Sequence, residues 1–74
     1  MAARYRVTAD WDAEAGVWVS TSDVPGLVIE TATLAEFEAV MRGLVPELLA
    51  ENCGVEGPVS IEWTSHGAFE LAAA

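Results

Sequence analysis

Acidic residues alternate along the stretch Asp10-Trp11-Asp12-Ala13-Glu14, and this spacing resembles the start of a calcium-binding loop. Such a loop needs a glycine at its sixth position and a bidentate glutamate at its twelfth. Counted from Asp10, those positions hold Ala15 and Thr21. We therefore interpret the acids as solvating carboxylates at the tip of a hairpin, and we expect no metal site there.

The other reactive side chains also form no recognisable catalytic set. A zinc site would need His66, the single histidine, and Cys53, the single cysteine, to meet two carboxylates from distant parts of the chain. The run Ser20-Thr21-Ser22 has no base at a spacing typical of nucleophilic catalysis, and there is no glycine-rich phosphate loop. The sequence predicts a protein that is not an enzyme and that needs no metal or cofactor.

The charge balance limits the partners. Three Lys and Arg residues stand against twelve Asp and Glu residues, which gives a formal net charge of −9. This charge repels nucleic acid and anionic lipid, so we expect direct binding to neither. A small basic protein would instead be attracted. The acid excess also has a simpler interpretation, since it would keep an apolar small domain in solution without any partner.

Size and composition favour self-association. The chain of 74 residues is 53% hydrophobic, and a chain this short buries only roughly 60–65% of its unfolded surface. Some apolar side chains therefore need a partner surface, and we expect a homodimer or homotetramer. The single cysteine and the absence of an apolar run at the N-terminus predict a cytoplasmic protein.

Two stretches predict a β-hairpin. Apolar and polar side chains alternate along 5–11, and 17–21 is rich in β-branched residues. The connection of five residues ends in Gly16, where a hairpin loop favours a positive φ. If Trp11 pairs with Val17, the apolar sides of both strands share one face.

This pairing leaves a large aromatic side chain on the other face of the sheet, among polar neighbours. We predict that this open face binds a partner. The predicted partner-binding residues are Trp18, Arg4, Arg6 and Ser20. The alternative is a lone surface tryptophan that stacks on its cross-strand neighbours and binds nothing.

The next segments predict a turn, a short third strand and a helix. In the turn 23–26, Asp23 can bond back to the backbone, Pro25 presets φ and Gly26 supplies left-handed geometry. A third strand is expected over 27–31. Thr33 and Glu36 then have the spacing of a capping box at the start of a helix.

The helix is amphipathic and contains a proline. Its apolar residues recur at steps of three and four: Leu34, Phe37, Met41, Leu44 and Leu48. Pro46 removes one backbone donor, which predicts a kink or a split into two short helices near 43–46. Gly54 is expected to end the helix. A fourth strand is expected over 59–64, and residues 68–71 form either a short last strand or a trailing segment. The helix is expected to cover one face of the sheet through a right-handed crossover.

The order of these features resembles the HicB-like antitoxin domains over about residues 5–51. Within that superfamily, the chain resembles short stand-alone bacterial domains of unknown function, which also carry an Asp-Val-Pro-Gly-Leu turn and a proline in the helix, here Pro46. The residues that carry the resemblance are Asp12, Gly16, Trp18, Ser20, the turn 23–27 and the helix start 33–36.

The resemblance implies a single α+β domain over residues 1–74 with a degenerate ribonuclease-H-like fold. In this β-β-β-α-β fold, three antiparallel strands precede the helix, and the fourth strand lies parallel beside the first. HicB antitoxins bind and neutralise a small basic RNA-cleaving toxin, HicA. Many carry a C-terminal DNA-binding segment, which is not expected here.

The expectation is therefore a non-enzymatic protein-interaction domain of the HicB antitoxin kind, with a small basic protein as a partner. One alternative is a self-assembling structural module without any other partner. A second alternative is a metal-dependent nuclease, because ribonuclease-H-like folds place acids on the first and fourth strands to hold two divalent ions. Asp10 and Glu62 would be the acids in that case.

Overall fold

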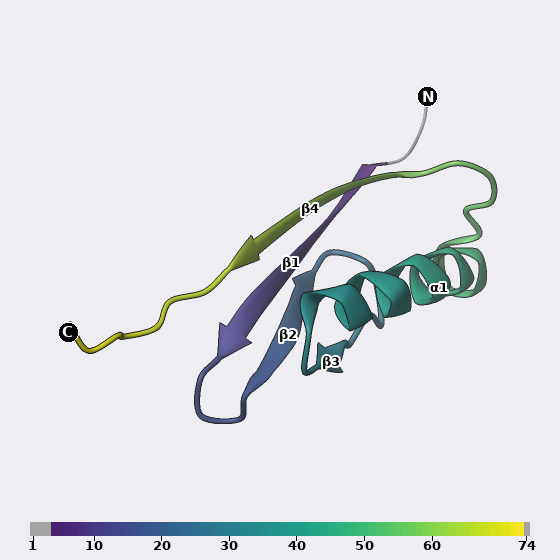
Figure 1. The fold of residues 1–74 in the computed structure, drawn as a ribbon. Coiled ribbons are helices and arrows are strands. Elements are labelled where there is room, and N and C mark those ends of the chain that lie inside the picture. Colours follow the sequence, from purple (N-terminus) through teal and green to yellow (C-terminus); the bar gives the residue numbers. More distant parts are fainter. Residues whose placement is uncertain (1–3, 74) are drawn as a thin grey trace.

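The computed structural model describes residues 4–73. It contains a sheet of four strands in the order β3-β2-β1-β4 and one helix packed against it (Figure 1). Strand β1 is antiparallel to β2 and parallel to β4. The elements are β1 (Arg4–Asp12), β2 (Val17–Ser22), β3 (Glu30–Thr31), α1 (Leu34–Cys53) and β4 (Ser60–His66). The predicted α+β fold, with its last strand beside its first, is confirmed.

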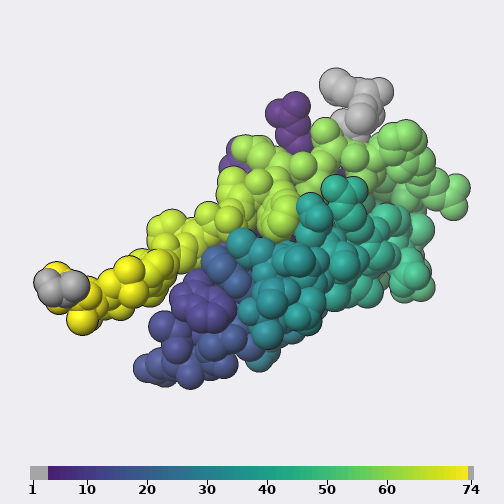
Figure 2. Space-filling view, viewed as in Figure 1, coloured from purple at the N-terminus to yellow at the C-terminus, as the bar shows by residue number. Residues whose placement is uncertain are grey.

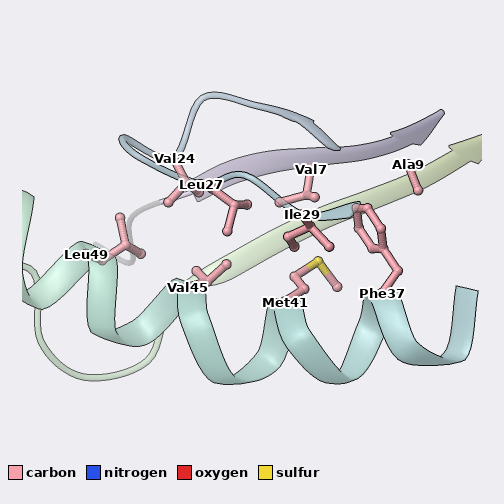
Figure 3. Packing of buried hydrophobic residues seen from close by; sticks show 9 residues of the cluster. All are labelled: Val7, Ala9, Val24, Leu27, Ile29, Phe37, Met41, Val45 and Leu49. Atoms are coloured by element: carbon pink, nitrogen blue, oxygen red, sulfur yellow. The ribbon is translucent and has the colours of Figure 1, made fainter. Parts of the chain in front are cut away.

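The core lies between α1 and the sheet. The helix contributes a buried residue at every fourth position, and β1 and the segment after β2 supply the opposing side chains (Figure 3). The buried apolar residues are Val7, Ala9, Val24, Leu27, Ile29, Phe37, Met41, Val45 and Leu49. Each large apolar side chain buried in this way stabilises the fold by about 1.5–3 kcal/mol.

Both ends of α1 are capped as the sequence predicts. The Thr33 hydroxyl oxygen accepts a hydrogen bond from the Glu36 backbone N–H at 3.1 Å. The hydroxyl group itself lies 3.2 Å from the Glu36 carboxylate, to which it donates. At the other end, Gly54 has a φ of 65° and donates its N–H to the carbonyl of Leu49. Between these caps the helix passes through Pro46 as one element, so the predicted alternative of two short helices is not found.

The hairpin register differs by one residue from the predicted register. Trp11 lies opposite Trp18, and Asp12, placed in the loop by the sequence prediction, pairs with Val17. The Asp12 carboxylate also accepts the backbone N–H groups of Glu14 and Ala15, at 3.1 and 3.2 Å. Asp12 is therefore both the last strand residue and the residue that organises the loop.

Within the hairpin loop, Gly16 has the positive φ that the sequence predicts. Gly16 has a φ of 69°, and its N–H donates to the Asp12 carbonyl at 2.8 Å. Because the loop contains four residues rather than five, every residue of β2 faces the side opposite to the predicted one.

The third strand is shorter than predicted. Only Glu30 and Thr31 pair with β2 as a regular strand. Ile29, which is 2% exposed, is attached to β2 through Ser20, whose N–H donates to the Ile29 carbonyl at 3.0 Å. The preceding turn has the predicted left-handed glycine, Gly26, with a φ of 82°. However, the Asp23 carboxylate accepts the N–H of Arg6 in β1 at 2.8 Å, rather than an N–H of its own turn.

Candidate functional site

The sheet face away from the helix carries mostly polar side chains, some of which bind one another, and it also carries Val17 and Val19. The Arg6 guanidinium lies 3.5 Å from the Glu62 carboxylate across β1 and β4. The hydroxyl groups of Thr8 and Thr64 are 3.2 Å apart on the same two strands. Such solvent-exposed pairs contribute little to stability.

The predicted partner-binding surface is not brought together. Arg4 and Arg6 lie on the open face, as expected. Trp18 and Ser20 lie on the helix side, because they pair with Trp11 and Ala9 in the shifted register. The placement of Trp18 and Ser20 on the open face was therefore wrong.

The structure gives both residues structural contacts on the helix side. The Trp18 ring lies 5.2 Å from the Trp11 ring at an angle of 54°, and it packs against the core. The Ser20 hydroxyl oxygen accepts the N–H of Ile29 at 2.8 Å. Ser20 thus satisfies a backbone donor in a segment that has left the regular strand pairing.

The acids proposed for a nuclease lie on one face but far apart. Asp10 is level with His66, and Glu62 is level with Arg6, four residues earlier in β4. Four residues of strand span about 13 Å, whereas the two ions of such a site lie about 3.5–4 Å apart. Glu62 is also held by Arg6. Within residues 4–73, no three His, Cys, Asp or Glu side chains gather closely enough to bind a metal.

A hollow of about 650 Å³ lies between α1 and β4. It exists because the helix lies closer to β3 than to β4 (Figure 1), so the inner side of β4 is only partly covered. Its apolar lining comes from α1, from β4 and from the residue before β4: Met41, Val45, Leu49, Val59, Ile61 and Trp63. We call this hollow the α1–β4 groove.

Trp63 forms the inner wall of the α1–β4 groove. Its ring stacks on Phe37, with ring centroids 6.3 Å apart and an interplanar angle of 1°. Its indole N–H is buried without an acceptor among the described residues. Ile61 and Trp63 share the apolar side of β4, as expected for the predicted strand 59–64, and Val59 comes just before the strand. The sequence contained no signal that the helix would leave these residues half-covered.

Two features of the C-terminal part of the chain are exposed. Strand β4 is at the edge of the sheet, so its outer backbone groups pair with no strand within residues 4–73. Beyond His66, the chain continues as an extended segment that projects from the body of the molecule, seen in yellow in Figure 2. In this segment Phe69 is 78% exposed and Leu71 is 81% exposed.

A second, smaller hollow of about 470 Å³ lies at the base of the projecting segment. Trp11, Trp18, Leu34 and Phe69 line it. A Cβ atom on Gly67 would lie 3.0 Å from the Cβ of Trp11, so any other residue there would require a shift of a few tenths of an ångström.

No helix among residues 4–73 is both long and apolar enough to span a bilayer.

The fold and its surfaces define a small α+β domain with one helical layer and an apolar groove beside an edge strand. The chain belongs to the family DUF1902, a domain of unknown function, whose match covers residues 4–68.

A related protein has a solved structure: the hypothetical protein TTHA1013 from the extremely thermophilic bacterium Thermus thermophilus. The two sequences are 46% identical, the match covers 95% of this chain and 99% of that chain, and the TM-score is 0.69. No curated protein shows significant similarity to the chain. The predicted relation to short domains of unknown function is confirmed, and the link to HicB antitoxins stays a prediction.

Proposed function

We propose that this chain is a non-enzymatic protein-interaction domain that assembles with copies of itself. The α1–β4 groove carries this proposal. It is an apolar hollow of about 650 Å³ beside the edge strand β4, in a chain that is 53% hydrophobic. An apolar hollow beside an open strand edge is typical of an interface rather than of a solvated face.

We further propose that the domain binds a small basic protein of the HicA kind, which its resemblance to HicB-like antitoxins implies. The distribution of charge favours this partner. The outer side of α1 exposes Glu36, Glu47 and Glu51, with Arg42 as its only cation. No basic residue lies in the last turn of α1, so nothing offsets the negative end of the helix dipole. A basic partner is attracted to this side of the molecule.

Calorimetric titration with a purified small basic toxin of the HicA kind tests the second proposal. We expect saturable binding that weakens in the variant Glu47→Gln/Glu51→Gln. The matched control is Glu14→Gln/Glu30→Gln, which removes the same charge elsewhere and should bind as the unchanged chain does.

Sedimentation velocity on the protein alone tests the first proposal, and we expect a dimer or larger species. A chain that sediments as a monomer and binds no toxin contradicts both proposals. A chain that assembles but binds no toxin is instead a self-assembling module, the alternative raised by the sequence.

A further inference from the structure

The projecting C-terminal segment, the open edge of β4 and the α1–β4 groove fit together as the parts of one interface. We propose that two copies pair antiparallel through β4, so that their sheets form one sheet of eight strands. In this dimer, the segment 67–71 of each copy covers the α1–β4 groove of the other copy. The inference rests on the proposed self-association. The surface is the α1–β4 groove with the edge of β4, and its occupant is the segment 67–71 of the second copy.

The alternation of side chains supports this assignment. In β4, Ile61 and Trp63 face the helix, since they are level with Tyr5 and Val7 in the parallel register. Side chains of an extended chain alternate between faces, so Phe69 and Leu71 belong to this same side. Phe69 does lie there, because it lines the smaller hollow together with the tryptophan pair.

The position of the two-fold axis follows from this alternation. If Ser65 pairs with Ser65 of the second copy, Phe69 lies opposite Ile61, and Leu71 lies opposite Val59. Ile61 and Val59 are both lining residues of the α1–β4 groove. Two side chains that are about four-fifths exposed in the single copy would then fill the apolar hollow that the helix leaves open.

The charges of the two copies are complementary at this interface. Glu70 alternates with Phe69 and Leu71, so it lies on the open face, opposite Ser60 of the other copy. Ser60 is level with Arg4 in β1, and Arg4 makes no ion pair among residues 4–73. Two strand spacings separate the backbones by about 10 Å, which long Arg and Glu side chains bridge.

The edge of β4 also has few of the features that usually prevent strand pairing. Edge strands avoid association through lysine, proline, bulges or short length. Strand β4 contains seven residues and neither lysine nor proline. Its one acid, Glu62, is paired with Arg6 within the same copy. An antiparallel neighbour would satisfy the outer backbone groups along the strand.

The first test removes the two exposed apolar side chains of the segment. We expect Phe69→Ser/Leu71→Ser to raise the dissociation constant of the dimer at least about 100-fold in sedimentation equilibrium, because four buried side chains are lost per dimer. The far-ultraviolet circular dichroism should not change. The control Val28→Ser/Val40→Ser alters exposed apolar residues outside the groove and should leave the dissociation constant unchanged.

The second test locates the axis. In a Cys53→Ser background, Ser65→Cys should form a disulfide-linked dimer on mild oxidation, because residues opposite one another in an antiparallel pair have Cα atoms about 4.5–5.5 Å apart. Thr21→Cys, on β2, should remain without a cross-link. A dimer that survives Phe69→Ser/Leu71→Ser and forms no Ser65→Cys cross-link overturns this interface but leaves the proposed self-association standing. A monomeric unchanged chain overturns both.

Discussion

Ser20 shows how one polar side chain allows the chain to leave the sheet without an unpaired backbone donor. The segment before β3 is buried at Ile29 but does not continue the regular strand pairing. The Ser20 backbone and hydroxyl together bind both the C=O and the N–H of Ile29. A serine on the apolar side of a strand is therefore part of the fold here, not part of a docking surface.

We expect Ser20→Ala to lower the free energy of unfolding by about 1–3 kcal/mol, because it leaves the partly buried N–H of Ile29 without an acceptor. Urea titration followed by tryptophan fluorescence measures this loss. The control is Thr21→Ala, at the next position, where the lost hydroxyl donates to Asp10 in a solvent-exposed pair. That change should cost no more than about 0.5 kcal/mol. Equal losses in the two variants would refute this role of Ser20.

At the scale of the elements, the helix was the most predictable part and the hairpin register the least. Thr33, Glu36 and Gly54 are cap residues with local geometry, so sequence alone placed both helix ends. The hairpin is different because Val17, Trp18 and Val19 are all apolar. Either face of β2 can therefore match the apolar side of β1, and alternation cannot select the register.

Loop length decided the hairpin register instead. The sequence prediction placed Asp12 in the loop, as an acid typical of turns. The structure shows that Asp12 pairs with Val17 while its carboxylate binds two loop N–H groups. A side chain that serves a strand and a turn together cannot be assigned to one of them from its residue type.

The N-cap of α1 gives a prediction at this scale. Thr33→Ala removes the acceptor for the Glu36 N–H and should lower the free energy of unfolding by about 0.5–2 kcal/mol. Thr33→Ser keeps a hydroxyl oxygen at the same place and should lose little. Thermal and urea unfolding of the two variants measure the difference. An identical loss for serine and alanine would mean that the methyl group, not the hydroxyl oxygen, stabilises the helix start.

For the whole molecule, the lateral position of α1 on the sheet determines the candidate site. The sequence predicted that a helix covers one face, which is confirmed. It did not predict that the helix would lie towards β3 and expose the inner side of β4, because amphipathic periodicity fixes which side of a helix is buried but not which strands it covers. The α1–β4 groove follows from that position and could only be found in three dimensions.

The net charge of −9 gives a prediction for the assembled state. Two like-charged copies repel each other, so added sodium chloride should strengthen the homodimer by screening. The complex with a basic toxin should weaken under the same change, because screening reduces the attraction. Sedimentation equilibrium and calorimetric titration at low and high salt measure the two responses. If added salt strengthened both interactions or weakened both, net charge would not control one of them.

The parallel pairing of β1 with β4 also affects how this chain is made. Thr8 and Thr64 touch across that pair although 56 positions separate them in sequence. One side of the first strand therefore has no neighbour until the ribosome has delivered residues 60–66, and contacts this distant form slowly. The nascent chain should remain incompletely folded, with the first strand exposed to chaperones, until the fourth strand has left the ribosomal tunnel.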